Sequence, residues 1–273
     1  MGAAQGERHA EECEGPRRQV NLPAFRIAQH PVTNSEFEAF VSATDYRTQA
    51  EIVGDSFVFQ GLLSAAARRK VRSIPAETPW WYPTEGANWG QPEGPGSDLA
   101  DRKDHPVVHV SWHDAHAFAR WARACLPSEA MWECAARGGV EGQSFPWGDE
   151  LEPEGRHMAN VWQGRFPGLD RAEDGFAGTS PVASFPANGY GLFDVIGNVW
   201  EWCEDWFDPG YHSNTSDTDP LCSAPTGQRA LRGGSFLCHA SYCARYRSAA
   251  RSCNRPDATA SNIGFRIAER SLR

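Results

Sequence analysis

Lysine and long hydrophobic runs are nearly absent from this chain of 273 residues. Lys70 and Lys103 are its two lysines, so arginine carries almost all of the positive charge. The net charge is −9, which argues against broad binding to nucleic acids or to anionic membranes. No window approaches the ~20 apolar residues of a membrane span, and no apolar segment of a signal peptide opens the chain. We therefore expect a soluble protein with no nucleic-acid or membrane partner.

The chain also lacks any Cys-x-x-Cys pair, which argues against a structural zinc ribbon. Its 8 cysteines are irregularly spaced and too sparse for a disulfide scaffold. Together with the missing leader, this pattern predicts a protein of the reducing cytoplasm.

Regular secondary structure is predicted to be sparse, because 26 Gly, 19 Pro and 11 Trp interrupt any long periodic segment. Thr33 with Glu36, and Ser111 with Asp114, have the spacing of helix N-caps, and Ser128 opens a third short helix that ends at the glycines 138–139. The short strand candidates are 25–27, 107–110, 230–232 and 264–267. No linker divides the chain, so we expect one irregular α+β domain over residues 1–273.

Cys238 and Cys243 are the most informative pair in the chain, since two nearby thiols can form a disulfide, bind one soft metal ion or do redox chemistry. Five residues separate them, which places their side chains apart on a helix and on opposite faces of a strand. They can therefore converge only if the chain turns between them. Gly233 and Gly234 permit unusual backbone angles just upstream. We expect a strand end leading into a loop with both sulfurs facing one cavity.

Arginines surround this pair between residues 229 and 255, and no acidic residue occurs before Asp257. Such a basic segment in an acidic protein could stabilise thiolates. The alternative is that the arginines form structural ion pairs, and for most of them we expect the ion pairs.

Two loop segments could bind a cation. Residues 160–176 and 194–201 carry Asn, Asp and Glu side chains among glycines, and such oxygen donors suit Ca²⁺. Neither segment is an EF-hand. From spacing alone, ordinary turns explain both segments better.

Four blocks of sequence form a signature. LPSEAMWE (126–133), GNVWEW (197–202) and GFR (264–266) belong to a broad pattern that relatives of other function share. The more specific block is GGSFLCHASYCARYR (233–247), which contains the cysteine pair, flanking aromatic residues and arginines. In these blocks the chain resembles the formylglycine-generating enzymes, the sulfatase-modifying factors, and the resemblance covers most of residues 30–270.

The resemblance implies a fold with little regular secondary structure, distantly similar to C-type lectins. It implies a copper-dependent oxidase that converts the cysteine of a sulfatase Cys-x-Pro-x-Arg motif to Cα-formylglycine, using O₂ and a thiol reductant. One Cu(I) would be held by Cys238 and Cys243, in agreement with the preference of soft thiolates for this ion. The substrate thiolate would join the two cysteines on copper, hydrogen would be taken from its Cβ, and the thioaldehyde would hydrolyse.

The resemblance also assigns roles to further residues. Ser235 and Trp200 would line an O₂ pocket, Tyr242 would shape the active site, and Asn262 and His239 would lie beside the substrate. Two structural calcium ions are implied. Their ligands would be Asn160, Val161, Asp174 and Phe176 at one site, and Asp194, Val195, Gly197, Val199 and Glu201 at the other.

Departures from the family pattern leave alternatives open. The family's opening strand, Ile-Pro-Gly-Gly-x-Phe-x-Met-Gly, is missing before Met1-Gly2, so we expect either that this strand is absent or that the gene start is truncated. Ser248 and Ile267 replace disulfide positions of secreted animal members, which fits a bacterial cytoplasmic enzyme. A non-catalytic binding or scaffold domain of the same fold is the second hypothesis. A sulfoxide synthase is the third, but the 9 His are scattered rather than clustered.

Overall fold

The computed structural model describes residues 1–3, 12–71 and 73–270 of the chain. The helices are α1 (Asn34–Thr44), α2 (Gln49–Val53), α3 (Ala65–Arg68), α4 (Trp112–Trp121), α5 (Glu129–Arg137), the 3-10 turn η1 (Pro153–Gly155) and α6 (Tyr211–Asn214). The strands are β1 (Phe25–Ile27), β2 (Asp55–Phe59), β3 (Trp81–Glu85), β4 (Gly164–Arg165), β5 (Leu169–Asp170), β6 (Trp200–Trp206), β7 (Arg229–Arg232), β8 (Ser252–Asn254), β9 (Ile263–Gly264) and β10 (Ala268–Arg270). These short elements joined by long loops confirm the predicted α+β class.

The helix starts are set by local capping, as predicted. The Thr33 side chain accepts a hydrogen bond from the backbone N–H of Glu36, whose carboxylate accepts one from the Thr33 N–H at 2.8 Å. Ser111 and Asp114 repeat this reciprocal box at α4. Ser128 caps α5 from one side only. Each cap satisfies backbone donors that the first helical turn leaves unpaired.

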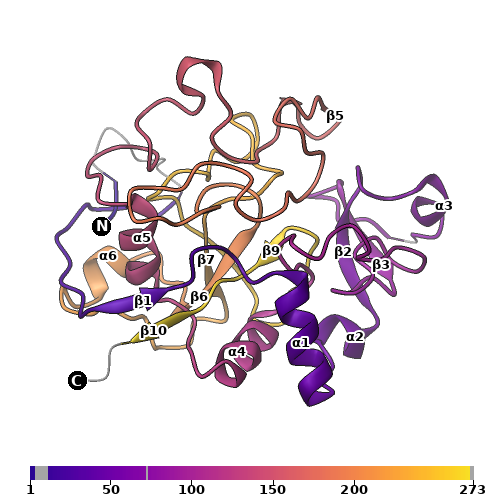
Figure 1. Cartoon of the computed structure of the whole chain (residues 1–273), viewed down its shortest axis with the longest axis horizontal. Coiled ribbons are helices and arrows are strands. Elements are labelled where there is room, and N and C mark those ends of the chain that lie inside the picture. The colour runs from indigo at the N-terminus through magenta and orange to yellow at the C-terminus, as the bar shows by residue number, and fades with distance from the viewer. Residues whose placement is uncertain (4–11, 72, 271–273) are drawn as a thin grey trace.

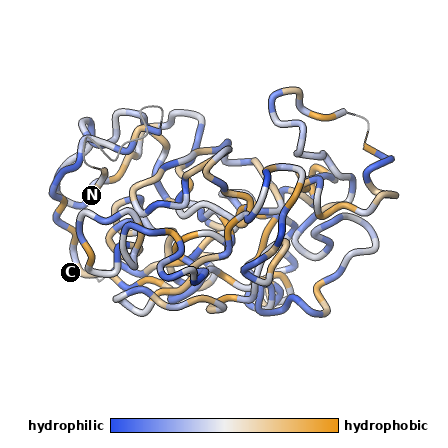
Figure 2. Tube along the Cα trace, turned by 90° about the horizontal axis from the view of Figure 1, so that it is seen from above, coloured by the Kyte–Doolittle hydropathy of each residue, from blue (hydrophilic) through white to orange (hydrophobic). Residues whose placement is uncertain are grey.

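A four-stranded sheet in the order β8-β7-β6-β9 forms the centre of the molecule, and α5 packs against β6 and β7 (Figure 1). β1 pairs with β10, which brings residues 25–27 beside the C-terminal end of the described chain. The β2–β3 hairpin and α3 lie at the opposite end from the termini in both views (Figure 1, Figure 2). The sheet therefore places β7, which leads into the cysteine segment, in the interior.

The strand predictions were partly right. Residues 25–27 form β1, and 230–232 lie within β7. The segment 107–110 is not a strand, because His109 takes a left-handed φ of 60° and the N–H groups of Val107 and His109 bond to different partners. The segment 264–267 is also wrong as one strand. β9 ends at Gly264, and Arg266 turns its side chain into the core.

The core is built largely from aromatic side chains. Phe37, Phe118 and Phe265 pack together, with ring centroids of Phe118 and Phe265 5.3 Å apart. Trp202 on β6 is fully buried and donates its indole N–H to the Val110 carbonyl at 3.0 Å.

Among the described residues, no helix has both the length and the apolar character that crossing a membrane requires.

Candidate active site

The chain turns between Cys238 and Cys243 and brings their sulfurs to 3.2 Å. Backbone hydrogen bonds from Cys238 N to Ser235 O and from Cys243 N to His239 O form this turn. Both thiols are buried and free, since a disulfide would hold its sulfurs at about 2.05 Å. Gly233, with φ 96°, starts the turn where a Cβ would lie 3.2 Å from the Trp132 ring. The turn inferred from the spacing is therefore present; we call residues 235–243 the cysteine loop.

The two thiols differ in acidity. The Cys238 S–H donates to the Cys243 sulfur, which lowers the pKa of Cys243, and Arg245 lowers it further against the opposing effect of burial. Burial raises the pKa of Cys238 well above its usual value, and the neighbouring Cys243 sulfur adds to that rise. The pair therefore holds one negative charge more easily than two, and Cys243 is the more acidic of the two thiols.

Most of the nearby arginines form ion pairs, as expected. Arg232 contacts the carboxylates of Glu129 at 3.2 Å and Glu133 at 2.6 Å, and Arg251 contacts Glu129 at 2.6 Å. All four side chains are almost fully buried, and we call them the ion-pair cluster. Arg245 is different: it pairs with Glu12 at 3.0 Å and also lines the cavity beside the cysteines.

A cavity of about 270 Å³ opens on the cysteine pair. Ser235, Trp200, Tyr242 and Asn262 line it, whereas His239 is not among its lining residues. The side-chain amide of Asn262 donates to the Ser235 hydroxyl at 3.0 Å. The backbone N–H of Trp200 donates to the backbone carbonyl of Asn262 at 2.9 Å. These contacts join strand β6, the cysteine loop and the segment before β9 into one wall.

Tyr242 forms another wall of the cavity. Its ring stacks on Phe166 with centroids 4.2 Å apart, and Trp80 meets it edge-on at 4.8 Å. Further lining residues come from Phe57, Trp81 and Thr259, which the motifs did not indicate. Phe57 and Trp81 lie far from the cysteines in sequence, so no spacing rule could have found them, whereas Thr259 lies three residues before Asn262.

The first segment with predicted calcium ligands is rich in converging oxygens. The Gln163 amide nitrogen donates to both the Val161 carbonyl and an Asp174 carboxylate oxygen, the latter at 2.9 Å. The Asn160 side-chain oxygen is buried without a hydrogen-bond partner. Phe176 follows with its N–H bonded to Asp174 at 3.0 Å. Oxygen donors of this kind fit a hard cation.

The second segment fits a cation less well. The Asp194 carboxylate accepts from the Ala183 N–H at 2.8 Å, and burial raises its pKa. Both Glu201 oxygens are held at 2.6 Å by Arg266, which balances the charge. Gly197 must lack a Cβ, because one would lie 2.2 Å from the Asn160 carbonyl oxygen. Val195 and Val199 are buried in the core, where only their backbone carbonyls could serve as ligands.

Clusters of three or more His, Cys, Asp or Glu side chains able to hold a metal do not occur within residues 1–3, 12–71 and 73–270. The sites considered above use fewer such groups, together with amide and backbone oxygens.

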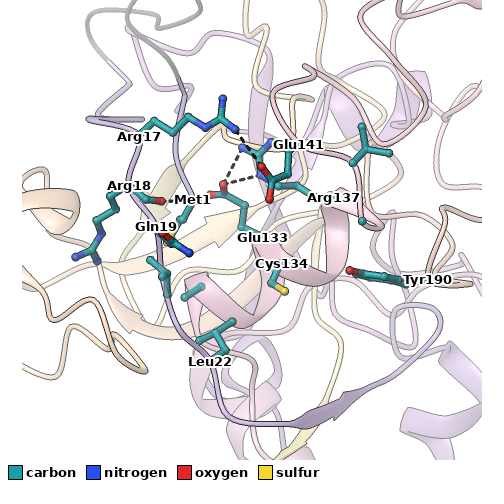
Figure 3. A pocket seen from close by; sticks show the side chains of 14 residues that line it. Met1, Arg17, Arg18, Gln19, Leu22, Glu133, Cys134, Arg137, Glu141 and Tyr190 are labelled. Atoms are coloured by element: carbon teal, nitrogen blue, oxygen red, sulfur yellow. Dashed lines mark hydrogen bonds and ion pairs between the residues drawn. The ribbon is translucent and has the colours of Figure 1, made fainter.

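A larger cavity of about 690 Å³ lies elsewhere and shares no lining residue with the cysteine cavity (Figure 3). Its wall includes Glu133, whose carboxylate is held by Arg137 at 2.8 Å, and the nearby Arg17 and Tyr190 (Figure 3). Glu133 also belongs to the ion-pair cluster, so this wall is part of the structural framework.

Residues 1–271 match the model of the sulfatase-modifying factor enzyme 1-like domain. The chain belongs to this family. It is similar to the formylglycine-generating enzyme of Thermomonospora curvata, at 51% identity over 98% of this chain and 89% of the relative. It is also 45% identical to a Bos taurus protein named inactive C-alpha-formylglycine-generating enzyme 2, over 93% of this chain and 80% of the relative.

Among solved structures, PvdO from Pseudomonas aeruginosa superposes with a TM-score of 0.72. It is 25% identical, and the alignment covers 99% of this chain and 90% of that structure. The sulfatase-modifying factor fold inferred from the motifs is therefore confirmed.

Proposed function

We propose that this chain oxidises the cysteine of a sulfatase Cys-x-Pro-x-Arg motif to Cα-formylglycine, with O₂ and a thiol reductant as co-substrates. The observation that carries the proposal is the buried, unbridged pair of Cys238 and Cys243 at 3.2 Å on the wall of a cavity. Relatives that bear the name formylglycine-generating enzyme support it. Overall, the substrate CH₂–SH and O₂ take two electrons and two protons from the reductant, and CHO, H₂S and water result.

The cysteine pair fits a single soft cation, and we propose Cu(I). The donor set consists of two thiols, one of which ionises readily because its neighbour donates a hydrogen bond to it. When bound, copper would supply the one-electron chemistry that couples O₂ reduction to oxidation of the substrate thiol.

The residues around the cysteine pair would shield it and position the substrates. Tyr242, stacked on Phe166 and met edge-on by Trp80, shields the cysteines on one side and offers an apolar wall to an extended peptide. Asn262 orients the Ser235 hydroxyl at the opposite wall, with Trp200 beside it. These positions suit an O₂ pocket. His239 lies at the rim of the loop, with its ring nitrogen bonded to Ser241 at 2.8 Å.

We further propose that calcium binds at residues 160–176. The unpartnered Asn160 oxygen, the Asp174 carboxylate and the backbone oxygens of Val161 and Phe176 would be its ligands. At the second site, Asp194 and the backbone oxygens of Val195, Gly197 and Val199 would contribute most, because Arg266 already neutralises Glu201. We also propose a cytoplasmic location, which the sparse and irregular spacing of the 8 cysteines supports.

A peptide assay tests the function. The protein, reconstituted with Cu(I), is mixed with a Cys-x-Pro-x-Arg peptide under air with a thiol reductant. Conversion of thiol to aldehyde by copper–thiolate chemistry lowers the peptide mass by about 18 Da. A protein that binds copper but leaves the peptide unchanged either has another substrate or lacks the active geometry.

The second candidate is a non-catalytic binding domain, which the similarity to a relative named as inactive favours. A protein that binds the peptide but neither copper nor O₂ would support it. The intact cysteine pair is the reason to rank it second.

A further inference from the structure

His109 is a buried histidine with no role in the chemistry described so far. Its side chain is fully buried, and burial lowers its pKa to about 3, so the ring is neutral at physiological pH. Its Nδ1 lies 2.7 Å from the Ser56 hydroxyl on β2. A neutral imidazole has one donor and one acceptor nitrogen, so this contact has a direction.

The hydrogen-bond chain continues from Ser56 to the cavity. The Ser56 hydroxyl lies 2.7 Å from the Thr259 hydroxyl, and both side chains are buried. Thr259 lines the same cavity as Cys238 and Cys243. A chain of three polar side chains thus begins in the core and ends at the cavity wall.

His109 and Ser56 also contact the segment of residues 259–262, of which Thr259, Ala260 and Asn262 line the cavity. The backbone N–H of His109 donates to the Ala260 carbonyl at 3.0 Å. Asn262, two residues further along, donates its side-chain amide N–H to the Ser235 hydroxyl in the cysteine loop at 3.0 Å. The segment is therefore held from behind by the core and contacts the cysteine loop in front.

We propose that Thr259 is a further substrate-binding residue of this cavity, and that His109 and Ser56 are positioning residues that orient its hydroxyl toward the substrate peptide. The inference rests on the proposed function for the identity of the peptide. An extended peptide carries N–H and C=O groups along its length, and a hydroxyl held from behind can bond either.

The tautomer of His109 decides which group Thr259 bonds. With the hydrogen on Nδ1, His109 donates to Ser56, Ser56 donates to Thr259, and Thr259 donates to a peptide carbonyl. With the hydrogen on Nε2, the His109 Nδ1 accepts from Ser56, the chain reverses, and Thr259 accepts from a peptide N–H. In both cases one hydrogen-bonding function of Thr259 remains for the cavity, because the other is used by Ser56.

The test measures binding separately from turnover. A labelled peptide with Ser in place of the reactive Cys (Ser-x-Pro-x-Arg) is titrated with the full chain, and the Kd is read by fluorescence anisotropy. Thr259→Val, which keeps the shape and removes the hydroxyl, should weaken binding about three- to tenfold, the usual effect of one neutral hydrogen bond. The matched control, Thr259→Ser, should stay within about twofold.

A double-mutant comparison tests the chain behind Thr259. Ser56→Ala should also weaken binding, and adding it to Thr259→Val should cause little further loss, because both changes break one chain. With the Cys peptide, KM should rise while kcat changes little. A purely structural role predicts the reverse, namely a lower melting temperature and lower kcat with Kd unchanged.

Equal Kd values for the Val and Ser variants, or fully additive losses, would overturn the inference. So would a wild-type protein that does not bind the peptide. A wild type that binds the Ser peptide but does not convert the Cys peptide would refute the proposed oxidase alone. The Kd series would then still decide the role of Thr259.

Discussion

The ion-pair cluster and the cysteine loop lie at the end of one strand, β7, yet the buried charges of the cluster are paired with opposite charges and the buried thiols of the loop are not. In the cluster, Arg232 lies between two carboxylates, and Glu129 in turn contacts Arg251. In the cysteine loop, the sulfurs of Cys238 and Cys243 contact mainly each other. A buried charge that is fully paired stabilises one arrangement, whereas a buried group left short of partners stays available for a ligand.

The pKa shifts express the same difference. Burial would raise the pKa of Glu133, but Arg232 and Arg137 outweigh burial and hold it below its ordinary value. Burial dominates for Cys238, whose pKa rises well above its ordinary value. The cluster is therefore charged at neutral pH, while the cysteine pair keeps a proton until a ligand replaces it.

The strongest test removes one member of the cysteine pair. Cys238→Ser or Cys243→Ser should reduce peptide conversion to background, because one sulfur cannot replace the pair. The melting temperature should change little, since few contacts depend on either sulfur. Conversion is followed by mass spectrometry and unfolding by circular dichroism. Undiminished turnover in either variant would disprove the assignment.

The complementary test disrupts the cluster and spares the loop. Glu129→Gln leaves Arg232 and Arg251 short of a buried counter-charge and should cost about 3–5 kcal/mol of unfolding free energy. The matched control is Arg255→Ala, which breaks an exposed pair with Asp257 and should cost under about 1 kcal/mol. Chemical denaturation measures both changes. Similar losses in the two variants would contradict the contrast drawn between buried and exposed pairs.

The cluster also predicts the response to acid. A carboxyl whose folded pKa is depressed contributes stability above its unfolded pKa, and this contribution is lost as the pH falls through the folded value. The pKa values of Glu129 and Glu133 are both lowered. Their contribution should therefore be complete above pH 4.5, the ordinary value for Glu, decline progressively as the pH falls below it, and be smaller in Glu129→Gln.

Asn160 is an intermediate case, since its buried oxygen has no partner although its amide nitrogen bonds to Gly178 at 2.8 Å. Calcium at about 100 times its Kd should stabilise the protein by about 2.7 kcal/mol, and a chelator should reverse the effect. Asn160→Leu should remove the response to calcium. Magnesium serves as the ion control in thermal unfolding. A melting temperature indifferent to calcium would argue against the proposed site.

The smallest effect concerns the acidity of the pair. The first thiolate should form below pH 9.0, the ordinary cysteine value, because the pKa of Cys243 is lowered. Arg245→Gln should raise that pKa modestly, since the Arg245 charge is partly neutralised by Glu12. Ultraviolet thiolate absorbance against pH in the metal-free protein measures the shift. Arg247→Gln is the control; an equal shift there would remove the special role of Arg245.

The sequence by itself determined the features that depend on neighbours a few residues apart. Thr33 with Glu36 and Ser111 with Asp114 begin helices because their side chains bond backbone groups three residues away. The turn between Cys238 and Cys243 followed from their spacing, and the family followed from contiguous motifs.

Only the tertiary structure decided the features that join distant segments. It placed Glu129 beside Arg232 and Arg251, and it brought Thr259 to the cavity through His109 and Ser56. It also made 107–110 an irregular segment, since His109 bonds to Ala260 instead of a neighbouring strand. These contacts depend on which elements pack together, and no local pattern of residues records that choice.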